Sequence, residues 1–177
     1  MSGPALLRAA DRRAVPWKDG GGITREIAVH PPGAGMDDFE WRVSIADVDA
    51  TGPFSRFENV DRILTLLEGR LQLDFAEATP KILLGPGDRH CFAGDAAVTG
   101  TPMGGPLRDL NIMVRRGLWS AKIEPYRPGA ADGDVRIALA TKACGTIEAL
   151  DALLLRDGED APPGFTGYLI MLDRLSG

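Results

Sequence analysis

The stretch WRVSIADVDATGPFSRFENVDRILTLLEG, residues 41–69, decides the fold class of this 177-residue chain. Trp41 to Val48 and Ile63 to Leu67 are short runs rich in aliphatic and β-branched side chains, and the turn pair Glu68-Gly69 follows the second run. Short apolar runs that end at turn residues are typical of β-strands. This stretch therefore predicts two strands of an all-β protein.

The same pattern continues on both sides of this stretch. Similar runs occupy residues 23–30, 70–75, 81–84, 107–115, 135–141 and 168–172. Turn-rich segments separate them, and 22 Gly with 13 Pro make 35 of the 177 residues, nearly a fifth, against a usual share of roughly 12%. Many short strands between turns predict a sandwich or a small barrel. Residues 147–156, IEALDALLLR, fit a helical turn or a strand.

Composition and charge exclude several kinds of partner. The net charge of −5 and the pI of about 5.0 lack the basic footprint that nucleic-acid binding needs. No apolar run approaches the roughly 18 residues of a membrane span, and no signal peptide is evident. Two His and two Cys match no zinc pattern, and two unpaired Cys fit the cytoplasm. Composition leaves a homodimer as a possible assembly.

The alternation of side chains along residues 107–116 defines two faces. Asp109, Asn111, Met113 and Arg115 share one face, whereas the opposite face is largely apolar. The polar face suits either solvent or a polar pocket in the mouth of a barrel. Antiparallel sheets commonly leave one side in water, which favours solvent on these grounds alone.

Arg62 opens the otherwise apolar run RILTLLEG and alternates with Leu64 and Leu66. If that face points inward, the guanidinium needs a carboxylate, which either the protein or a ligand supplies. The alternative is an exposed arginine at the end of a strand. Trp17, just before three glycines, is either a lid or a core anchor.

Four motifs together resemble the HutD/Ves family of small bacterial cupin-like proteins. They are WKDGGGITREIAV (17–29), residues 41–69, GDRHCFAGD (87–95) and RDLNIMVRR (108–116), in the order of the family. Asp19 and Ala93 stand where the family more usually has Asn and Pro. The resemblance implies an all-β, cupin-like double-stranded β-helix barrel arranged as a compact bicupin. Residues 1–125 would form the N-terminal barrel with the main pocket, and residues 126–177 a second, smaller half.

The metal-binding pattern of cupins is absent when it is aligned on this resemblance. Its glutamate falls at Arg62, and its first two histidines fall at Arg56 and Glu58, or at Ser55 and Phe57. The histidine of the second cupin motif falls at Val98. We therefore expect no metal and no cofactor. An arginine in place of the carboxylate repels a cation and suits an anion, which also favours a pocket over solvent around Asp109 and Asn111.

The family resemblance implies a modulator or regulator of histidine utilisation that binds a small carboxylate such as urocanate or formylglutamate. The leading hypothesis is a metal-free binding protein for a small anionic metabolite, with no catalytic residue assigned. Its candidate ligand-binding residues are Arg62, Asp109, Asn111, Arg115, Trp17, Trp41, Thr24 and Glu26. The alternative is a metal-independent enzyme with Glu26 and Asp109 as general acid or base. A third class is a regulator that acts through a protein partner.

Overall fold

The computed structural model of the protein describes residues 3–130 and 133–176. Its contacts divide the chain into two compact units. Residues 13–116 form one of them, here called the barrel unit, and residues 1–12 with 117–177 form the other, here called the terminal unit. In the described ranges the 3₁₀ turn η1 (Ala9–Asp11) is the only helical element, and all other elements are strands. The all-β fold class is therefore confirmed.

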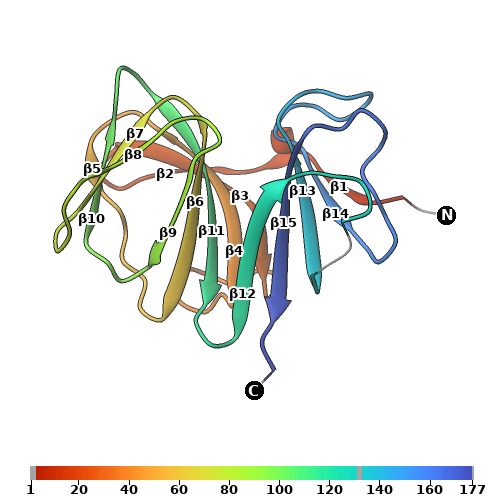
Figure 1. The fold of residues 1–177 in the computed structure, drawn as a ribbon, viewed down its shortest axis with the longest axis horizontal. Coiled ribbons are helices and arrows are strands. Elements are labelled where there is room, and N and C mark those ends of the chain that lie inside the picture. Colours follow the sequence, from red (N-terminus) through yellow and green to blue (C-terminus); the bar gives the residue numbers. More distant parts are fainter. Residues whose placement is uncertain (1–2, 131–132, 177) are drawn as a thin grey trace. The chain divides into compact units, whose positions relative to one another are not determined.

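The barrel unit consists of two antiparallel sheets (Figure 1). The six-stranded sheet has the order β2 (Ala14–Pro16), β3 (Gly22–His30), β4 (Trp41–Val48), β11 (Leu107–Arg115), β6 (Val60–Glu68) and β9 (Arg89–Ala93). The four-stranded sheet has the order β5 (Gly52–Pro53), β10 (Val98–Pro102), β7 (Leu71–Phe75) and β8 (Ile82–Leu84).

An apolar core joins these two sheets. Its buried members come from β4, β6 and β11 of one sheet and from β7, β8 and β10 of the other: Ala46, Val48, Leu64, Leu66, Leu71, Leu73, Leu84, Val98 and Leu107. Because side chains alternate along each strand, one face of the six-stranded sheet supplies this core. Two antiparallel sheets around one core form the cupin-like barrel that was expected.

The terminal unit contains a five-stranded antiparallel sheet. Its order is β1 (Ala5–Leu7), β14 (Ala152–Leu155), β13 (Val135–Ala140), β15 (Gly167–Arg174) and β12 (Trp119–Pro125). Buried Leu153, Phe165, Leu169 and Met171 belong to its core. The first strand of the chain therefore pairs with a strand near its end.

The expected boundary between the two halves differs from the observed division. The turn-rich residues 126–134 predicted it at residue 126, whereas the barrel unit ends at Arg116. The reason is that β12 pairs along its whole length with β15, so residues 119–125 belong to the terminal unit. Residues 1–12 join them because β1 pairs with β14.

The eight predicted strands are all present, and β4 and β11 have the expected bounds. The strands β1, β2, β5, β9, β10 and β12 were not predicted, and all of these except β12, which has seven residues, have five residues or fewer. Within residues 147–156, for which helix and strand were both open, only Ala152–Leu155 forms a regular element, and it is a strand. In the part of the chain that the structure describes, no helix is long and apolar enough to cross a membrane.

Candidate functional site

A cavity of about 520 Å³ opens within the barrel unit. Residues of β2, β3, β4, β5, β6 and β11 line it, together with the loops that follow β2, β3 and β5. The lining is half apolar and half polar, and it includes two arginines and one buried aspartate. Polar groups that converge among apolar side chains in a hollow are typical of small-molecule sites.

The register of β11 against β4 places the predicted polar face on this cavity. Asp109 lies opposite Ala46, and Asn111 lies opposite Ser44. All four residues line the cavity, as does Met113 one step further along β11. The polar side of β11 therefore faces the cavity and not solvent. This is the alternative that the family resemblance favoured.

Arg62 extends from β6 into the cavity and is 4% exposed. Its guanidinium carbon lies 5.1, 5.2 and 5.8 Å from the ring centres of Phe54, Phe92 and Phe57. Its Nε donates to Asn111 Oδ1 at 3.4 Å, and a terminal nitrogen donates to a backbone carbonyl at 3.1 Å. Rings on several sides hold the cation in one place.

Burial lowers the pKa of Arg62 to about 10, while the negative charge of Asp109 acts in the opposite direction. The group therefore remains a cation at neutral pH. The described residues place no Asp or Glu oxygen within 4.0 Å of the Arg62 nitrogens. Arg62 is thus a buried, caged charge that lines a cavity without a directly contacting counter-ion.

Asp109 is 2% exposed, and its Oδ2 atom makes no hydrogen bond in the described part of the chain. Burial raises the pKa of this carboxyl to about 7, against the effect of Arg62, and the charge of Asp47 raises it further. Both protonation states are therefore accessible near neutral pH. A buried carboxyl of this kind is costly to keep without a partner.

Arg42 is the second guanidinium of the cavity, and the sequence analysis missed it. Its Nε donates to Glu26 Oε2 at 2.8 Å, and Nη1 lies 3.5 Å from Ser44 Oγ. The signal was present in the sequence, since Arg42 shares strand parity with Ser44 and Ala46. Glu26 itself does not line the cavity; its half-exposed side chain neutralises Arg42 at the edge.

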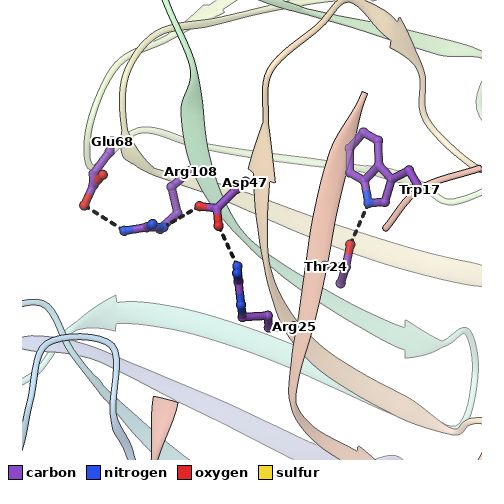
Figure 2. Close-up of polar contacts among 6 residues, drawn as sticks. All are labelled: Trp17, Thr24, Arg25, Asp47, Glu68 and Arg108. Carbon is purple, nitrogen blue, oxygen red and sulfur yellow. Dashed lines mark hydrogen bonds and ion pairs between the residues drawn. The ribbon is translucent and has the colours of Figure 1, made fainter. Parts of the chain in front are cut away.

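Trp17 forms part of the cavity wall, and its indole Nε1 donates to Thr24 Oγ1 at 2.7 Å (Figure 2). Gly22 makes this position accessible, since a Cβ there would lie 3.0 Å from the Trp17 ring and 2.7 Å from the carbonyl oxygen of Asp47. Asp19, where the family more usually has Asn, accepts a hydrogen bond from the Gly21 N–H at 2.9 Å. An Asn side-chain oxygen can accept the same bond.

Besides Glu26, two expected site residues, Arg115 and Trp41, do not line the cavity. Arg115 shares the parity of Asn111, but it lies at the end of β11 and donates to three backbone carbonyls at 3.0 to 3.3 Å. Trp41 lies on the opposite face of β4 from Arg42 and is stacked with His30 at 5.8 Å between ring centres. Their places on the strands exclude both from the cavity lining.

The segment that follows β5 supplies cavity residues that the sequence analysis considered only as lost metal positions. Ser55, Phe57 and Arg62 line the cavity, whereas Arg56 and Glu58 do not. Across the described ranges, no group of three or more His, Cys, Asp or Glu side chains could hold a metal ion. Those cupin ligand positions that line the cavity therefore carry a cation, a hydroxyl and an aromatic ring.

Two solved structures are similar to this chain over nearly its whole length. A conserved protein of unknown function from Pseudomonas aeruginosa PAO1 is 29% identical, with a TM-score of 0.80 over 97% of this chain and 100% of that one. The structure titled HutD from Pseudomonas fluorescens SBW25, in a formate condition, is 26% identical, with a TM-score of 0.80 over 97% and 99%.

Two curated relatives are closer in sequence but match over a shorter length. An uncharacterized 21.2 kDa protein in the hutC 3′ region of Pseudomonas putida is 39% identical over 70% of this chain and 65% of its own length. Protein Ves from Citrobacter koseri is 42% identical over 64% of this chain and 60% of its own. The chain thus spans less than two thirds of these relatives. The name of the first relative links the family to a histidine-utilisation locus. The HutD family model matches residues 9–161, and the chain belongs to this family.

Proposed function

We propose that this chain is a metal-free binding protein for a small carboxylate metabolite and that it modulates histidine utilisation. The carboxylate would pair with Arg62 inside the cavity. Urocanate and formylglutamate are the first ligands to test, because the family is linked to a histidine-utilisation locus.

One observation carries the proposal: Arg62 is a buried guanidinium that lines a cavity of about 520 Å³ and has no carboxylate in contact among the residues that the structure describes. A guanidinium matches a carboxylate in geometry, and such pairs are strong where water is excluded. The ring cage and the bond to Asn111 fix the cation before a ligand arrives, so little conformational entropy is lost on binding.

The test is calorimetric titration of the whole chain with urocanate and with formylglutamate. Arg62→Ala should weaken binding at least about 30-fold, since a charge-assisted contact is lost. Arg62→Lys should recover only part of the affinity, because an ammonium cannot make the two parallel bonds of a guanidinium. Arg56→Ala is the matched control: this exposed arginine lies six residues away and does not line the cavity.

Circular dichroism would establish that each variant is folded. Equal affinity of the wild type and Arg62→Ala for both ligands would refute the assignment of Arg62. Binding of neither ligand by the wild type would refute carboxylate binding in the form proposed here.

A second candidate function, a metal-independent enzyme, draws support from Asp109 alone. Its raised pKa of about 7 suits a general acid or base at neutral pH. Glu26, the other expected acid or base, lies outside the cavity lining and is paired with Arg42. Incubation of each ligand with purified protein distinguishes the two functions: turnover that Asp109→Asn abolishes would support the enzyme, and unchanged ligand would support a binding protein.

A further inference from the structure

We propose that Asp109 is a specificity-determining residue of the same cavity, and that the ligand carries an N–H donor in addition to its carboxylate. This inference rests on the proposed function, since Arg62 takes the carboxylate. Asp109 would accept the hydrogen bond from the N–H group and so distinguish this ligand from carboxylates that lack such a donor.

The first argument is the placement of the two groups. Asp109 and Asn111 are successive residues on the cavity face of β11, and Arg62 reaches Asn111 from β6. Both Arg62 and Asp109 line the cavity, yet no ion pair within 4.0 Å joins them among the described residues. Two opposite charges in one hollow that do not touch leave room for a molecule that contacts both.

The second argument is the unsatisfied carboxyl. The side chain of Asp109 is nearly fully buried, and its Oδ2 makes no hydrogen bond with the described residues. Most buried polar atoms in folded proteins have a partner, so an exception calls for a reason. A ligand donor that completes the carboxyl is such a reason, because it recovers a hydrogen bond that folding left unmade.

The charges around Asp109 decide which kind of second group fits. Arg62 faces it from β6, Arg42 from the cavity face of β4, and Asp47 from the other face of β4. Arg42 is already paired with Glu26, and Lys18, the third cation of the lining, is exposed. Arg62 is therefore the buried cation of the cavity lining that has no contacting carboxylate among the described residues. A ligand with two carboxylates would bring two negative charges to this one unpaired buried cation, and only the exposed Lys18 could take the second. A carboxylate with an N–H donor instead matches both Arg62 and Asp109.

A matched pair of ligands tests the inference by calorimetry on the whole chain. Urocanate carries a carboxylate and a ring N–H, and trans-3-(2-furyl)acrylate has a five-membered ring of similar shape without the N–H. The wild type should bind urocanate at least about 10-fold more tightly, the size expected for one hydrogen bond to a charged group.

Two variants locate this preference at Asp109. Asp109→Asn keeps an oxygen acceptor but loses the charge, and should reduce the preference to about threefold. Asp109→Leu removes the acceptor and should abolish the preference. Asp61→Asn is the control, because this exposed carboxylate pairs with Arg116 and does not line the cavity.

The outcomes separate the inference from the proposed function. Equal binding of both ligands, or tighter binding of furylacrylate, would overturn the role of Asp109 and leave carboxylate binding intact. Succinate bound more tightly than urocanate would do the same. Binding of none of these carboxylates would overturn the proposed function, and the inference with it.

Discussion

Asp109 shows how a buried functional group can lower the free energy of unfolding of the chain. A carboxyl with a raised pKa binds its proton more tightly in the folded chain than in the unfolded one. Between the unfolded value near 3.9 and the folded value of about 7, the folded state therefore holds more protons. The free energy of unfolding consequently falls as the pH rises through this window.

Asp109→Asn should remove this loss. Without ligand, the free energy of unfolding of the variant minus that of the wild type should increase by about 2 to 3 kcal/mol from pH 5 to pH 8. Each pH unit within the window contributes about 1.36 kcal/mol to this difference. Urea denaturation at the two pH values measures the difference. Asp61→Asn, an exposed control, should change it by less than about 0.5 kcal/mol. A difference for Asp109→Asn that is independent of pH would mean that the carboxyl titrates normally.

At the scale of the strands, four charged side chains bridge the six-stranded sheet next to the cavity wall (Figure 2). Arg25 of β3 and Arg108 of β11 donate to the two carboxylate oxygens of Asp47 on β4, at 2.6 and 2.7 Å. Arg108 also pairs with Glu68 at the end of β6 at 3.2 Å. Partial burial raises the pKa of Asp47, but the two arginines outweigh it and hold the pKa below its usual range.

Asp47→Asn should therefore destabilise the barrel unit, by about 1 to 2 kcal/mol at pH 7, because both arginines lose their shared carboxylate. A carboxylate whose pKa is lowered by folding stabilises the folded state at pH values above its unfolded pKa. The difference in stability between the wild type and Asp47→Asn should therefore shrink as the pH falls below about 4. Thermal unfolding at pH 7 and pH 3.5 measures it. Glu68→Gln, at the exposed end of the network, should cost less than about 0.5 kcal/mol; a larger loss there than at Asp47 would contradict this account.

Strand parity explains which parts of the site the sequence predicts. The alternation along residues 107–116 places Asp109 and Asn111 on one face, and the lost metal pattern indicates Arg62 as an inward cation; all three line the cavity. The same parity cannot show where a strand leaves the cavity, so Arg115 was included although backbone carbonyls bind it outside. The ring cage around Arg62 depends on loops, and spacing along strands contains no information about loop packing.

Short strands were missed for a different reason. Strands such as β5 (Gly52–Pro53) and β10 (Val98–Pro102) contain Gly, Pro and Thr, whose local signal is that of a turn. They form because a neighbouring strand supplies hydrogen-bond partners; Thr99 of β10, for example, pairs with Asp74 of β7 and Pro53 of β5. Such pairing is tertiary, and a local pattern does not contain it.

At the scale of the whole chain, the N-terminal segment completes the terminal unit although the barrel unit separates them in sequence. β1 pairs with β14, and Asp151, just before β14, accepts hydrogen bonds from the backbone N–H groups of Ala9 and Glu148 at 2.7 and 3.0 Å. Arg8 adds an ion pair at 3.1 Å. Burial raises the pKa of Asp151, but these hydrogen bonds and the Arg8 charge outweigh it and lower the pKa overall. A buried carboxylate thus fixes the start of the chain to its last third.

Asp151→Ala should therefore reduce the free energy of unfolding of the terminal unit by about 2 to 4 kcal/mol, since several donors to one buried carboxylate lose their partner. Hydrogen exchange should show faster amide exchange in β1 and β14. The cavity is lined entirely by residues between 15 and 113, so urocanate affinity of the folded variant should stay within about twofold of the wild type. Asp157→Ala, at an exposed turn, should change neither quantity. Loss of ligand affinity in folded Asp151→Ala would show that the site depends on the terminal unit.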